Sequence, residues 1–123
     1  MRAAPGWPRE LPPPDDPDWK RRAIGWLLDQ SPGEWRGIPE LARQPLVLVV
    51  AVVNHVAATR AGVRATVAGL RSELAGAVTP DTAEAAVTAL LAEEARLDRV
   101  VREVGLVAEA IRRAAAAPRG GGA

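Results

Sequence analysis

Two long apolar-periodic runs, at residues 45–75 and 80–117, meet at a single break, and this feature most constrains the fold. Gly76 is typical of the residue that follows a helix, and Thr79-Pro80-Asp81 supplies an N-cap, a first-turn proline and a first-turn acid. Because the connection is short, the two helices should pack antiparallel. We therefore expect an all-α fold centred on a long antiparallel helical hairpin.

The first run begins with Leu-Val-Leu-Val-Val-Ala-Val-Val at residues 46–53, which taken alone would also fit a buried strand. We predict a helix because the apolar spacing continues through Val56, Val63 and Leu70. The first two turns are apolar on all sides. They should therefore be covered by more than one neighbouring element.

The second run carries an apolar stripe wider than a strict two-stranded coiled-coil seam. Its main positions recur at seven-residue spacing, and they are flanked by Val87, Val100, Val101 and Val107. Because such a stripe needs more than one neighbour, we take it as the candidate interaction surface for a partner helix or a second copy. The surface consists of Leu90, Leu97, Val100, Val104, Val107 and Ile111.

An antiparallel register follows from the position of the break. If the turn centres near residues 77–78, positions whose numbers sum to about 155 lie side by side, which places Arg71 near Glu84 and Arg60 near Glu94. Arg60 and Glu94 each interrupt an apolar line. We predict that they pair across the seam and fix its register.

The front of the chain is rich in proline and divides the sequence into three parts. Residues 1–16 are expected to form a disordered Pro-rich leader, residues 17–117 a single helical domain and residues 118–123 a flexible tail. Asp16 should cap a first helix over 17–29, and short helical pieces should follow before Pro45. Trp19 and Trp26 of that first helix are natural covers for the start of the first long run.

The supply of reactive side chains is small. The chain has one histidine and no cysteine, and its 16 basic and 15 acidic residues give a net charge of +1. His55 is expected to be a partly buried core histidine, and the acids on the second run have arginines three or four positions away. These observations predict a non-enzymatic protein with no catalytic residue, no metal site, no cofactor and no small-molecule substrate.

Two other binding modes remain as alternatives. A small regulator would bind nucleic acid through its arginines, or a membrane surface through Trp19, Trp26 and the basic residues 20–22. The unbroken apolar run at 46–53 is far shorter than the ~20 residues that span a bilayer, and no signal-like segment opens the chain. We therefore expect a cytoplasmic protein.

Several short motifs carry a resemblance to small, functionally unassigned helical proteins of high-GC Gram-positive bacteria. They are Trp26-Leu27-Leu28-Asp29, Glu34-Trp35-Arg36 after Pro32, Arg43-x-Pro45-Leu46 and Asn54-His55-Val56. Lys20 is the only lysine, as a GC-rich bacterial genome would favour. The resemblance implies a helical fold and brings no activity. The leading hypothesis is thus a helical interaction module that self-associates or binds a partner helix.

Overall fold

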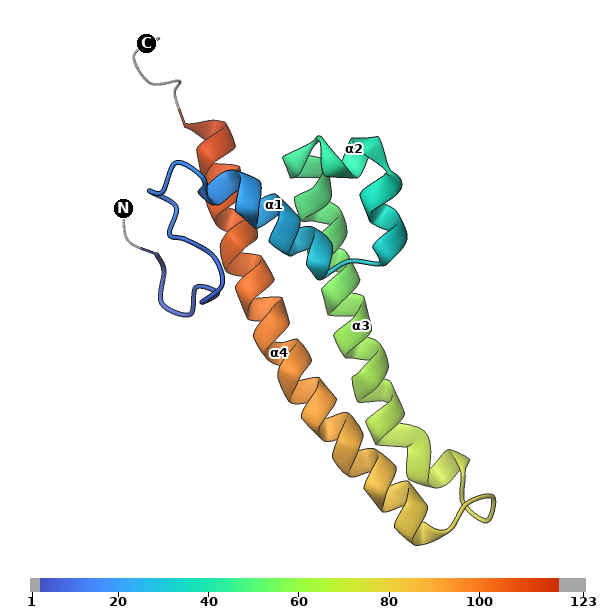
Figure 1. Ribbon diagram of the computed structural model, residues 1–123. Helices are drawn as coiled ribbons and strands as arrows, with labels where there is room; N and C mark the ends of the chain where they lie inside the picture. The colour runs from blue at the N-terminus through green and yellow to red at the C-terminus, as the bar shows by residue number, and fades with distance from the viewer. Residues whose placement is uncertain (1–2, 118–123) are drawn as a thin grey trace.

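A computed structural model describes residues 3–117, and helices dominate this part of the chain (Figure 1). The order is α1 (Trp19–Asp29), the 3-10 helix η1 (Gly33–Gly37), α2 (Pro39–Ala42), α3 (Pro45–Glu73) and α4 (Pro80–Ala116). The all-α prediction is confirmed, and both long helices end within two residues of their predicted bounds. The tail expected at 118–123 lies outside the described residues.

Helices α3 and α4 form the predicted antiparallel hairpin (Figure 1). At the turn Gly76 has φ +81°, a left-handed conformation that side chains with a Cβ rarely adopt. The Thr79 hydroxyl accepts a hydrogen bond from the Thr82 backbone N–H at 3.2 Å and so caps α4. Both signals that predicted the break therefore act as expected.

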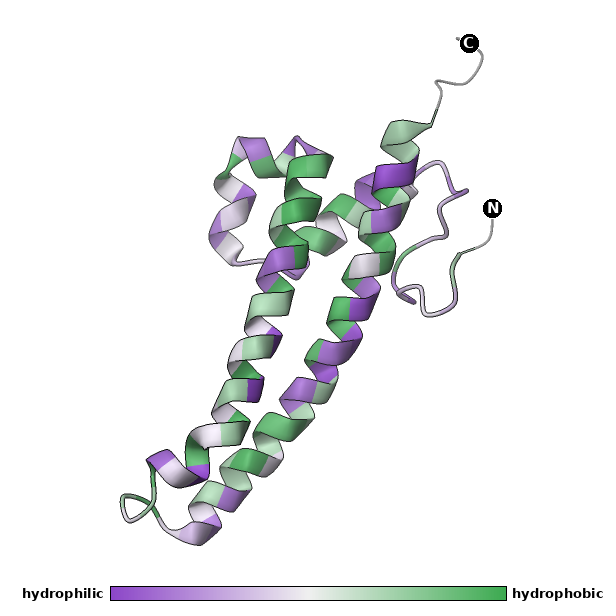
Figure 2. Cartoon of the chain, turned by 180° about the vertical axis from the view of Figure 1, so that it is seen from behind, coloured by the Kyte–Doolittle hydropathy of each residue, from purple (hydrophilic) through white to green (hydrophobic). Residues whose placement is uncertain are grey.

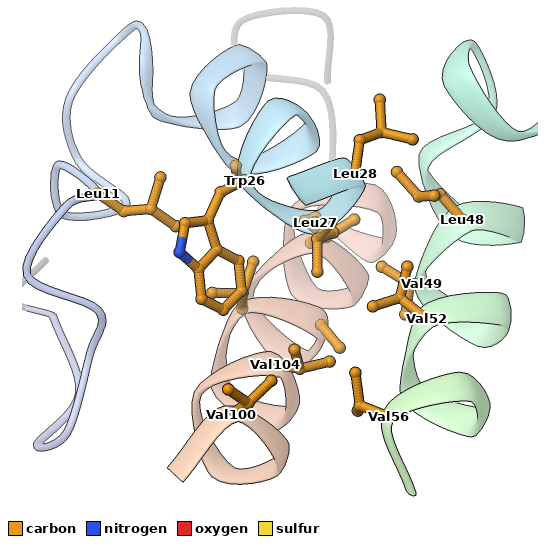
Figure 3. Close-up of a cluster of buried hydrophobic side chains, with 14 of the residues drawn as sticks. Leu11, Trp26, Leu27, Leu28, Leu48, Val49, Val52, Val56, Val100 and Val104 are labelled. Atoms are coloured by element: carbon orange, nitrogen blue, oxygen red, sulfur yellow. The ribbon is translucent and has the colours of Figure 1, made fainter. Parts of the chain in front are cut away.

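The hydrophobic core lies at the end of the hairpin away from the turn. There α1 crosses α3 and α4, and Leu27 packs among side chains of both long helices (Figure 3). Helix α2 packs beside the beginning of α3, and η1 packs against α1 and α2. Toward the turn the molecule thins to two helices, where Ala83 and Val87 are the buried residues of α4. The packing is therefore layered at one end and only two helices thick at the other.

The Pro-rich leader was expected to be disordered, but residues 3–16 are packed on the protein. Residues 3–16 lie against the side of α4 opposite α3, in both views of the chain (Figures 1 and 2). Pro8 is fully buried and Leu11 belongs to the core, while the Trp7 indole N–H donates to the Pro12 carbonyl at 3.2 Å. The segment is ordered because these apolar side chains find a surface that α3 and α1 leave open.

Helix α1 also begins later than predicted. Its first residue is Trp19, and Asp18 occupies the N-cap position without a capping hydrogen bond from its side chain. Asp16 instead accepts a hydrogen bond from the Asp18 backbone N–H at 2.8 Å. Asp16 thus forms a turn two residues ahead of the helix, a local alternative that aspartate commonly adopts.

Candidate interaction surface

The stripe of α4 predicted to bind a partner is covered within the chain. Five of its six residues, Leu97, Val100, Val104, Val107 and Ile111, are buried, and Leu90 is half-buried. The stripe does contact several neighbouring elements, as predicted. These neighbours are α3, α1 and the N-terminal segment of the same chain. The stripe is therefore core, and the interaction surface must be sought elsewhere.

The seam between the long helices holds one of the two predicted ion pairs. Near the turn Arg71 contacts Glu84 at 2.5 Å, as expected. Further along, Arg64 contacts Glu94 at 3.1 Å, and Arg60 contacts Asp98 at 3.5 Å, so the predicted pair of Arg60 with Glu94 is wrong.

Arg60 reaches Asp98, which lies one turn further from the connection than Glu94. This direction agrees with the lean of helical side chains toward the N-terminus of their own helix. Arg64 Nη2 also reaches Asp98, at 3.3 Å. The three arginines of α3, Arg60, Arg64 and Arg71, are thus each in contact with a carboxylate of α4.

The outer face of α3 carries the most exposed group of large apolar side chains in the described part of the chain. Leu46, Val47 and Val50 are 49%, 48% and 54% exposed, and their spacing places them on one side of the helix. The ribbon of α3 is coloured hydrophobic over its N-terminal turns (Figure 2). We call these three residues, with the exposed Asn54 and Ala58 below them, the α3 outer face.

Removing water from the α3 outer face should cost little free energy. No charged residue occurs from Pro45 to Thr59. The Asn54 side-chain amide donates to the Val50 carbonyl at 3.0 Å, and the Thr59 hydroxyl donates to the His55 carbonyl at 2.9 Å. Because these polar groups already have partners in their own helix, covering the face would leave few hydrogen bonds unmade.

Helix α3 is also long and apolar enough, by length and composition, to cross a membrane, and 22% of its most apolar stretch is buried inside the protein. The unbroken run at 46–53 underestimated this because alanines and glycines extend it. The Trp-rich helix considered as a membrane anchor is packed on the hairpin instead, with Trp19 and Trp26 buried.

His55 lies at the junction of α1, α3 and α4, beside a cavity of about 280 Å³. Its ring meets Trp35 edge-on, with centroids 5.4 Å apart. Ser31, which also lines this cavity, donates its hydroxyl hydrogen to the Leu27 carbonyl at 2.8 Å. Neither group is arranged as a nucleophile with its base, so the cavity offers no catalytic pair.

Comparisons of the chain with protein-family models, curated proteins and solved structures gave no match. The assignment of a function therefore depends on the surface itself. Its signal was present in the sequence: Leu46, Val47 and Val50 are apolar at positions that a single covering layer cannot reach. The sequence alone did not show which sides of α3 the N-terminal elements would cover.

Proposed function

We propose that this protein is a non-enzymatic helical interaction module that self-associates through the α3 outer face. The observation that carries the proposal is the half exposure of Leu46, Val47 and Val50 on an uncharged stretch of helix. Grouped exposed apolar residues of this kind mark sites of association more often than free surface. Burying them supplies the hydrophobic free energy for association.

A second copy fits this face because it is self-complementary. Two uncharged faces related by a two-fold axis meet without like-charge repulsion, and the same patch serves both partners. Further along α3 the exposed residues Ala58, Ala61 and Ala65 are small, which permits close approach of another helix. The arginines of α3 are held in the seam with α4 and do not obstruct this contact.

Sedimentation velocity tests the proposal with a matched pair of variants. Val50→Glu places a charge on the α3 outer face, and Leu91→Glu places one at an α4 position with a similar exposed fraction, 50%. We expect wild type and Leu91→Glu to form dimers at a chain concentration of roughly tens of micromolar. Val50→Glu should remain monomeric at the same concentration. A monomeric wild type at high micromolar concentration, or equal loss in both variants, would overturn self-association.

Membrane association through the same face is a second candidate, favoured by the length and composition of α3. It predicts co-flotation with neutral phosphatidylcholine vesicles that persists at high salt and is lost in Val50→Glu. Binding through arginines would instead require anionic lipid and would weaken with salt. If the protein floats with neither the neutral nor the anionic vesicles, membrane association is ruled out.

A further inference from the structure

A charged groove of about 930 Å³ lies between the N-terminal segment and α4. One wall is formed by residues 5–7, 9 and 10 of the N-terminal segment. The other is one face of α4, where Arg99, Arg102, Glu103 and Leu106 follow each other at helical spacing. Gly6 has φ +86°, a backbone conformation that side chains with a Cβ rarely adopt, and it lets the N-terminal segment turn beside Leu106 of α4.

Three arginines in this groove have unused hydrogen-bond donors. Within the described residues Arg9, Arg99 and Arg102 are exposed and form no direct ion pair, in contrast to Arg60 and Arg64 in the hairpin seam. A guanidinium offers a planar fork of donors that matches a carboxylate or a phosphate. The groove therefore presents several such forks in one concave place.

The two acids of the groove neutralise these arginines only in part. Glu10 is turned toward α1, where its carboxylate accepts a hydrogen bond from the Trp26 indole N–H at 3.0 Å. Burial, together with repulsion from Glu10, raises the pKa of the half-buried Glu103 carboxyl above its ordinary range. The charged form of Glu103 is therefore destabilised. The groove also holds three arginines against two glutamates, so positive charge is in excess.

An apolar pocket of about 330 Å³ adjoins the charged groove and shares Trp7 and Leu106 with it. Trp19, Ala110 and Ala114 also line this pocket. Trp7 meets Trp19 edge-on at 6.3 Å between ring centroids, which holds the indole between the two spaces. A cationic site and an apolar site thus lie side by side on the same face of α4.

We propose that this site binds an organic anion with an apolar body. Its acidic group would meet Arg9, Arg99 and Arg102, and its apolar body would lie against Trp7 and Leu106. Pockets that hold small ligands have this mixture of apolar lining and a few polar groups that fix orientation. The site is separate from the α3 outer face, so it neither depends on self-association nor explains it.

Isothermal titration calorimetry with three probes tests the ligand class on the full chain. Octanoate carries both features, octanol only the apolar body and inorganic phosphate only the charge. We expect one octanoate to bind per chain, at least about tenfold more tightly than octanol or phosphate. Equal affinity for octanol, or for phosphate, would overturn the proposal, because each would show that one half of the site binds alone.

Two variants and a control test the residues. Arg99→Gln combined with Arg102→Gln should weaken octanoate binding about tenfold or more, while Glu103→Gln should tighten it. The control, Arg43→Gln combined with Arg112→Gln, removes the same charge from exposed arginines outside the groove. Equal weakening in the control, or weaker binding in Glu103→Gln with unchanged helical content, would contradict the assignment.

Discussion

Glu10 forms a hydrogen bond between the N-terminal segment and α1, and this bond depends on the charge of its carboxylate. The Trp26 indole N–H donates to its carboxylate and holds the pKa of Glu10 below its ordinary value of 4.5. A carboxyl whose pKa is lowered by folding adds stability above its unfolded pKa and loses it as pH falls through the folded value. The attachment should therefore weaken in acid, below about pH 4.5.

We expect amide hydrogen exchange over residues 7–11, corrected for intrinsic rates, to accelerate between about pH 6 and about pH 3. Glu10→Gln keeps an oxygen acceptor but cannot titrate, so it should show no such step. Glu103 must be changed to glutamine in both proteins, because its protonation relieves repulsion with Glu10 and acts in the opposite direction. The same step in both proteins would show that Glu10 is not the group responsible.

The seam provides a second test at single residues. In double-mutant cycles with alanine, Arg64 and Glu94 should couple by about 0.2–1 kcal/mol, the usual range for partly exposed pairs. Arg60 and Glu94 should show coupling near zero, because Arg60 contacts Asp98. Denaturant melts of the variants measure both, and a larger coupling for Arg60 with Glu94 would restore the register expected from the sequence.

The difference between the two registers shows what a sequence can predict at this scale. Counting from the turn found the right helix faces and the pair of Arg71 with Glu84. It failed for Arg60, because residue numbers locate Cα atoms, whereas the partner of a long side chain also depends on the direction in which that side chain extends. The outcome for ion pairs therefore depends on side-chain direction as well as on register.

At the scale of elements, helix ends were predictable where local signals set them. Gly76, Thr79 and Pro80 determine the turn through backbone conformation and capping, which are properties of a few neighbouring residues. The packing of Pro8 and Leu11 on α4 was not predictable, because proline-rich composition carries no information about a distant docking surface. Because the docking of this segment was not predicted, the apolar stripe of α4 was interpreted as a surface for another chain.

Helix α1 acts as a clamp on the open end of the hairpin. Leu27 is fully buried between α1 and the two long helices (Figure 3). Leu27→Ala should therefore lower the free energy of unfolding by about 2–5 kcal/mol, since it leaves a cavity where three elements meet. Leu91→Ala, at an exposed position of α4, should change it by less than about 0.5 kcal/mol.

Chemical denaturation followed by circular dichroism measures both changes. If Leu27→Ala cost no more than Leu91→Ala, α1 would not be part of the cooperative core.

For the whole molecule, the arrangement of the core determines which surface remains for partners. The N-terminal segment, α1 and α3 cover the apolar stripe of α4, whereas Leu46, Val47 and Val50 remain exposed at the N-terminal turns of α3. The sequence correctly indicated more apolar surface than one hairpin can bury. It placed the excess on the wrong helix, because the coverage depends on how the short elements fold back.

Cysteine cross-linking tests this account most directly, because the chain has no cysteine of its own. Val47→Cys places a thiol on the α3 outer face, and Leu91→Cys places one at an α4 position of nearly equal exposure. Under mild oxidation we predict rapid formation of a disulfide-linked dimer by Val47→Cys and little by Leu91→Cys. Faster cross-linking of Leu91→Cys, or equal rates for the two variants, would contradict association through α3.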